Sequence, residues 1–155
     1  MDSRPTKRAR VSPVLNALGD HLVDDVSGIC LAYLNHDDIE FSEGRLPRNN
    51  VCSYAARGGC LEVLQWARVN DCPWSALTCS EAAGGGHLKM LQWAIANGCS
   101  WDETTCSEAS CGGHLDVLKW ARVNGCPWDE MTLTSAADGG HLEVLKWARA
   151  NGCPE

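Results

Sequence analysis

The sequence has no long hydrophobic run. None of its 155 residues lie in a segment that approaches the roughly 20 consecutive apolar residues of a membrane helix. Basic residues near the start are followed by a run, residues 14–23, that polar side chains interrupt, so a secretory signal is not expected. These absences predict a soluble protein with no membrane attachment, located inside the cell in the cytoplasm or the nucleus.

Positive charge is scarce outside the first fifteen residues. The formal net charge is −7, and because the first fifteen residues carry +3, the rest carries −10. A body this acidic repels a phosphate backbone, so we expect no nucleic-acid binding through it. Residues 1–14 are expected to be a disordered basic arm. Within this arm, Lys7, Arg8 and Arg10 resemble a short nuclear-import signal, a pattern that also arises by chance.

Tryptophan, cysteine and histidine recur with a strict period of 27 residues. A fixed period of this length is typical of repeat proteins. The series in phase are Trp66, Trp93, Trp120 and Trp147; Trp74, Trp101 and Trp128; Cys72, Cys99, Cys126 and Cys153; and His87, His114 and His141. Several residue types in phase exclude coincidence, so residues 49–155 form a tandem array of four copies that begin near positions 49, 76, 103 and 130.

Each copy is predicted to form two short helices. In the third copy, Asp102 offers an N-cap carboxylate, residues 103–111 favour a helix, and a Gly-Gly pair ends it. Residues 114–124 place apolar side chains at helical spacing, and Gly125 supplies the left-handed residue that ends many helices. Such short helices do not stand alone in water, so neighbouring copies are expected to stack.

The copies resemble ankyrin repeats. The residues that carry the resemblance are Gly113 to Lys119 closing at Asn124-Gly125, Gly140 to Lys146 closing at Asn151-Gly152, and Thr104 and Ala109 at two positions of the family's Thr-Pro-Leu-His-x-Ala. The resemblance covers residues 49–155 and implies an all-α solenoid of four helix–turn–helix repeats that binds another protein. The period is shorter than the family's usual length of about 33, and the missing residues fall where the family has its β-hairpin finger.

Variation between the copies is concentrated in three columns on the predicted first helices. These columns are spaced three and four residues apart, which puts their side chains on one helix face. They are Tyr54, Glu81, Glu108 and Ser135; Arg57, Gly84, Cys111 and Asp138; and Asn50, Leu77, Thr104 and Met131. Positions that vary along a constant scaffold are not packing positions, so this face is predicted to bind a partner protein. The alternative is a solvated face with no ligand.

The same columns predict the chemistry of the partner. The first two columns match groove-lining positions of the ankyrin pattern, so the resemblance implies a groove lined by the first helices. Because Glu81 and Glu108 lie on an acidic body, we expect the partner to offer a basic or mixed-charge segment.

Two roles are open to the cysteine and histidine columns, a metal or catalytic site and a purely structural role. Zinc ligands lie within about 4 Å of one another, whereas packed helices are about 8–10 Å apart, so members of one column cannot share an ion or a disulfide. The cysteines are therefore predicted to be free thiols in the core, like the tryptophans. No nucleophile with an orienting carboxylate recurs beside the histidines, so we expect each ring to bond nearby backbone and the chain to have no enzyme activity, metal or cofactor.

The two ends of the array carry separate predictions. Residues 15–48 are expected to form a helical cap on the first copy. The stretch from Leu18 to Ile39 also resembles the first half of an F-box, which implies an alternative function as the substrate adaptor of a ubiquitin ligase. At the other end, the last copy keeps the apolar pattern of the internal copies in Leu142, Val144, Leu145, Trp147 and Ala148. This apolar end predicts a longer array or self-association through the last repeat.

Overall fold

The computed structural model describes residues 51–69 and 71–155. Regular structure in these ranges consists of eight helices and includes no strand. The helices are α2 (Val51–Arg57), α3 (Leu61–Val69), α4 (Ala76–Gly84), α5 (Leu88–Ala96), α6 (Glu103–Cys111), α7 (Leu115–Val123), α8 (Glu130–Asp138) and α9 (Leu142–Ala150). An all-α fold is thus confirmed for this part of the chain. The basic arm and the cap predicted for residues 1–14 and 15–48 lie outside the described residues.

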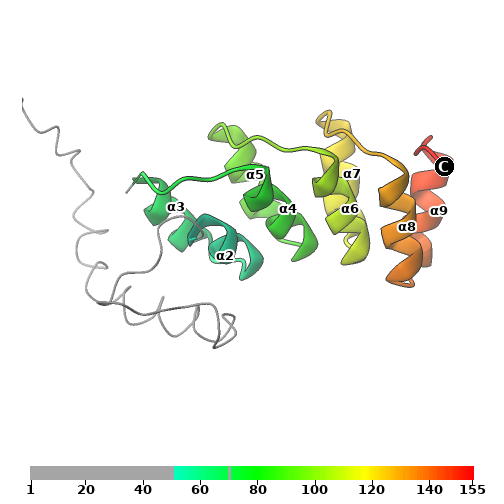
Figure 1. The fold of residues 1–155 in the computed structure, drawn as a ribbon, viewed down its shortest axis with the longest axis horizontal. Helices are drawn as coiled ribbons and strands as arrows, with labels where there is room; N and C mark the ends of the chain where they lie inside the picture. The colour runs from blue at the N-terminus through cyan, green and yellow to red at the C-terminus, as the bar shows by residue number, and fades with distance from the viewer. Residues whose placement is uncertain (1–50, 70) are drawn as a thin grey trace, which may run out of the picture.

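The helices form pairs that stand in a row in the order of the chain (Figure 1). Each pair holds the first helix and the second helix of one 27-residue copy. The first helices α2, α4, α6 and α8 contact one another in succession, and each of them also packs against the second helix of its own copy. Because a pair touches chiefly its neighbours, the array is held together by contacts between adjacent copies.

Small side chains allow the first helices to approach one another closely. Each first helix buries an alanine at the equivalent position, namely Ala55, Ala82, Ala109 and Ala136. The second helices bury larger side chains, among them Leu64, Leu91 and Leu118. A close-packed interior does not accept additional volume without strain, so the alanine column fixes the spacing of the first helices.

The helix ends agree with the local sequence signals. The carboxylates of Asp102 and Asp129 each accept a hydrogen bond, 3.1 Å long, from the backbone N–H two residues further on. Left-handed backbone follows the second helices at Gly98, Gly125 and Gly152, with φ between 79° and 86°. The first copy has Asp71 at the equivalent position, with φ 56°. The structure therefore retains the sharp helix end even where glycine is absent.

The tryptophans lie at the edge of the core. All seven are partly buried. Each connector tryptophan meets a second-helix tryptophan edge to face, with centroid distances of 6.0, 5.6 and 6.0 Å in Trp74–Trp93, Trp101–Trp120 and Trp128–Trp147. The guanidinium groups of Arg68 and Arg122 cover Trp74 and Trp128 at 4.2 and 4.1 Å. The rings thus fasten the connectors to the helices that follow them.

Each described helix is at most nine residues long. None of them has the length and apolar character that crossing a membrane requires.

Candidate binding face

The residues predicted to contact a partner all lie on the first helices and outside the core. Tyr54, Glu81 and Ser135 are partly buried, and the other seven are exposed: Arg57, Leu77, Thr104, Glu108, Cys111, Met131 and Asp138. We call these ten residues, together with Gly84, the first-helix face. Because neighbouring first helices are in contact, the side chains from four copies adjoin one another.

Helix geometry separates this face from the core. In α6, Cys106, Ala109 and Ser110 are buried, whereas Glu108 and Cys111 are exposed. Side chains three and four residues apart share one side of a helix, so the buried residues form one stripe and the exposed residues another. The same division recurs in α4, where Cys79, Ala82 and Ala83 are buried.

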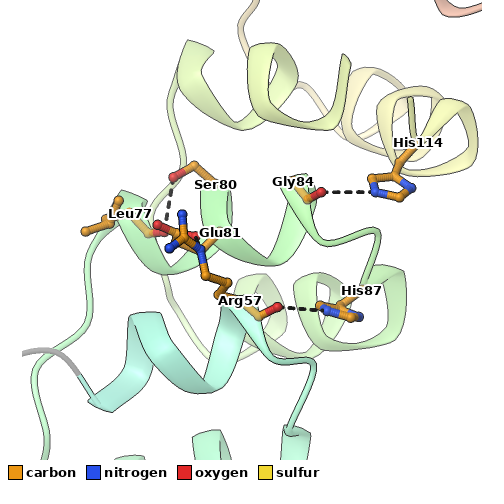
Figure 2. A network of polar contacts seen from close by, with 7 residues as sticks. All are labelled: Arg57, Leu77, Ser80, Glu81, Gly84, His87 and His114. Atoms are coloured by element: carbon orange, nitrogen blue, oxygen red, sulfur yellow. Dashed lines mark hydrogen bonds and ion pairs between the residues drawn. The ribbon is translucent and has the colours of Figure 1, made fainter. Parts of the chain in front are cut away.

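An ion pair crosses the face between the first two copies. Nε of Arg57 on α2 lies 2.8 Å from Oε2 of Glu81 on α4 (Figure 2). The Arg57 side chain is mostly exposed, so solvent screens the pair, and such pairs contribute about 0.2–1 kcal/mol. Between the first and second copies, Arg57 therefore neutralises the charge of Glu81 within the chain.

Between the second and third copies, the corresponding glutamate has no such ion pair in the described part of the chain. Gly84 takes the position of Arg57, and a Cβ added to Gly84 would lie 3.2 Å from Oε2 of Glu108. The Glu108 carboxylate therefore lies beside a glycine, and it forms no ion pair within the described part of the chain. Cys111 and Asp138 continue the column without any basic residue. The centre of the face thus carries an exposed negative charge that no basic side chain of the described residues neutralises.

Two apolar side chains lie at the beginning of the first helices. Leu77 is 53% exposed and Met131 is 52% exposed, and they occupy equivalent positions on α4 and α8. Thr104 on α6 stands between them in the column. The apolar contribution to the face is therefore two separate points and not a continuous patch.

The histidine column connects neighbouring copies. Nε2 of His87, His114 and His141 lies 3.2, 3.0 and 2.9 Å from the carbonyl oxygens of Arg57, Gly84 and Cys111, respectively. Figure 2 shows the first two of these contacts. A carbonyl only accepts hydrogen bonds, so Nε2 carries the proton and donates it. The rings do bond backbone, as predicted, but the backbone belongs to the preceding copy and not to their own turn.

The cysteines in the described ranges are nine free thiols. Members of one column do not meet, as predicted. Thiols of two different columns do lie close together: Cys99 and Cys126 each donate a hydrogen bond, 3.4 Å long, to the carbonyl oxygen four residues before Cys79 and Cys106, respectively. Sequence reasoning missed these pairs because it compared cysteines within a column or within one helix. The signal that would have found them is the spacing of 20 residues, which recurs in the first three copies.

Within residues 51–69 and 71–155, no group of three or more His, Cys, Asp or Glu side chains is arranged to hold a metal ion. Nε2 of each of the three histidines contacts a backbone carbonyl oxygen of the preceding copy. The three imidazole rings thus join neighbouring copies.

Neither protein-family models nor curated proteins give a match to this chain. The F-box-like segment from Leu18 to Ile39 lies outside the described residues.

Proposed function

We propose that the chain is a shortened ankyrin-like solenoid that binds another protein through the first-helix face. The row of helix pairs, with each copy contacting the next, supports this architecture. A row of equivalent helices presents a long surface whose shape is constant and whose side chains differ from copy to copy. Such a surface recognises an extended segment of a partner.

The observation that carries the proposal is the contrast between two kinds of column. The buried column keeps alanine in all four copies, at Ala55, Ala82, Ala109 and Ala136. The column three residues before Arg57, which lies outside the core, changes from tyrosine to glutamate to serine along the array. Packing explains the constancy of the first column and places no demand on the second, so the second is free to provide specificity.

Charge supports a basic or mixed-charge partner segment. Arg57 already neutralises Glu81, whereas Glu108 beside Gly84 lacks a basic neighbour. An arginine or lysine of the partner placed beside Gly84 would give Glu108 the ion pair that Glu81 already has. Opposite charge also speeds the approach of the partner to this acidic body. The same acidity opposes nucleic-acid binding by the array.

The test compares two charge reversals in the third copy. Glu108→Lys changes the first-helix face, and Asp116→Lys makes the same charge change on the second helix α7, where Asp116 is exposed. Proteins bound by the wild-type chain in native extract are identified by quantitative mass spectrometry, and the affinity of the strongest binder is then measured with purified components. We expect Glu108→Lys to weaken binding at least tenfold and Asp116→Lys to leave it within about twofold.

Circular dichroism and thermal melting establish that both variants are folded. If Glu108→Lys leaves the affinity unchanged while Asp116→Lys abolishes it in a folded protein, the binding face lies on the second helices and the proposal is wrong.

A further inference from the structure

The first three copies each bring together two cysteines that are 20 residues apart in sequence. One comes from the first helix and the other from the connector after the second helix. The pairs are Cys52 with Cys72, Cys79 with Cys99, and Cys106 with Cys126. In the fourth copy the first-helix position is Leu133, so Cys153 has no equivalent thiol partner. Three copies thus contain a dithiol, and the fourth provides a natural comparison.

The geometry of the second pair is set by one backbone carbonyl. The thiol of Cys99 donates a hydrogen bond to the carbonyl oxygen of Ser75, at 3.4 Å. Ser75 precedes Cys79 by four residues, one helical turn, and side chains on a helix lean toward its N-terminus. The sulfur of Cys79 therefore leans toward the place that the sulfur of Cys99 occupies, and each thiol affects the pKa of the other.

The two sulfurs of this pair are not equivalent. Cys99 retains 6% of its surface exposed, and Cys79 is fully buried. Because the attacking thiolate has to meet a disulfide that arrives from solvent, the less buried Cys99 is the nucleophile and the fully buried Cys79 is the resolving thiol.

We propose that Cys79 and Cys99 are a dithiol site that is oxidised to an intramolecular disulfide by exchange with a low-molecular-weight disulfide such as glutathione disulfide. Cys99 gives up its proton to solvent, and its thiolate attacks one glutathione sulfur, which breaks the glutathione disulfide and releases one glutathione thiolate. Cys79 then loses its proton and attacks the Cys99 sulfur, which releases the second glutathione thiolate. Two protein thiols are oxidised, one glutathione disulfide is reduced, and the released thiolates take up the two protons.

The disulfide would tie α4 to the connector between α5 and α6. Helix α4 carries Leu77, Glu81 and Gly84 of the first-helix face, so oxidation would rigidify the second copy without covering that face. The other two dithiols are more deeply enclosed than Cys99. We therefore expect Cys79 and Cys99 to react before the equivalent pairs in the first and third copies.

The experiment incubates the folded full chain with glutathione disulfide and follows it by intact mass and by peptide mapping after alkylation. The double variant Cys60→Ser/Cys111→Ser serves as the starting protein because both thiols are more exposed than Cys99 and would otherwise form mixed disulfides. We expect a product lighter by two hydrogens, a linked Cys79–Cys99 peptide, and a melting temperature raised by on the order of 10 °C, since the bond closes a 20-residue loop. Dithiothreitol should reverse all three changes.

The variant Cys79→Ser distinguishes a dithiol site from a single reactive thiol. Without the resolving thiol, Cys99 should retain one glutathionyl group, whereas Cys99→Ser should leave Cys79 unmodified. The proposal is overturned if Cys79 and Cys99 stay reduced while the protein is folded and become linked only in denaturant. It is equally overturned if Cys153, which lacks a thiol partner, reacts as fast as Cys99.

Discussion

Glycine at the end of three of the four first helices makes room for a histidine ring. A Cβ added at Gly112 would lie 2.5 Å from the carbonyl oxygen of Gly84 and 2.6 Å from Cδ2 of His114. Neither distance is compatible with van der Waals contact between carbon and its neighbours. The first copy differs because Cys60 replaces the histidine there, and a Cβ at Gly58 would meet its nearest atom at 3.5 Å. Sterically, glycine is therefore required at Gly112, whereas the equivalent Gly58 has room for a Cβ.

Gly112→Ala should destabilise the array, and Gly58→Ala should not. The first substitution forces the ring of His114 away from the Gly84 carbonyl, and overpacking of this kind costs about 1–3 kcal/mol. The second substitution meets only ordinary contacts, so a change within about 0.5 kcal/mol is expected. Urea unfolding followed by circular dichroism measures both. Equal losses in the two variants would show that the histidine contact is not the cause.

Alkaline pH should weaken the folded state through the buried thiols. Burial raises the pKa of Cys52 to about 11 from the ordinary value of 9.0. The unfolded chain therefore loses this proton at a lower pH than the folded chain, and the stability contributed by the protonated thiol is lost as pH rises from about 9 to about 11. A shift of this size corresponds to about 2–3 kcal/mol. Urea unfolding at pH 8 and pH 10.5 should show the loss, and Cys52→Ala should reduce the difference between the two pH values.

At the scale of the helix, the sharp turn after each second helix depends on one left-handed residue. Gly98, Gly125 and Gly152 take this conformation without steric cost, because glycine has no Cβ. Asp71 takes it in the first copy at φ 56°, where a side chain is strained. The repeat therefore keeps a left-handed backbone at Asp71, although a residue with a Cβ disfavours this conformation.

Asp71→Gly should stabilise the protein by about 0.5–1 kcal/mol, because it removes the left-handed strain at the end of α3. Gly98→Ala, the matched substitution at the equivalent end of α5, should destabilise it by about 1 kcal/mol, since nothing lies within 4 Å of the added Cβ and only the backbone conformation is penalised. Thermal melting gives the sign of each change. A lower melting temperature for Asp71→Gly would mean that the aspartate side chain contributes a favourable contact.

At the scale of the whole molecule, each helix pair packs on one side against the next pair in the row. The last pair, α8 and α9, has no next pair among the described residues. Leu64, Leu91 and Leu118 are fully buried, whereas the equivalent Leu145 is only partly buried. Leu142 is 62% exposed, although its counterparts in the other copies are partly buried. Apolar side chains at the end of a repeat array favour association with another surface.

We expect the 155-residue chain to cover this end by self-association that depends on concentration, whereas in a longer array a further copy would cover it. Leu142→Lys places a charge on the exposed apolar end and should shift sedimentation toward the monomer. Val123→Lys makes the equivalent change at another exposed apolar residue, on α7 in the third copy, and should leave association unchanged. Sedimentation velocity across a hundredfold range of concentration measures both. A wild-type chain that remains monomeric throughout would contradict this expectation.

The sequence specified the local features that depend on near neighbours along the chain. The 27-residue period, the helix ends at Asp102 and Gly125, and the exposure of Leu77, Thr104 and Met131 follow from periodicity, capping and helical side-chain spacing. These rules act over a few residues, so one sequence is enough to apply them.

The tertiary structure alone decided which columns touch each other. The hydrogen bond from His114 to Gly84, the thiol pair of Cys79 and Cys99, and the ion pair of Arg57 with Glu81 each join residues 20 to 30 positions apart. Such contacts depend on how far one copy is shifted and turned relative to the next. That displacement is set by close packing of the small side chains between the first helices, and a repeat period states that copies are equivalent without stating how they stack.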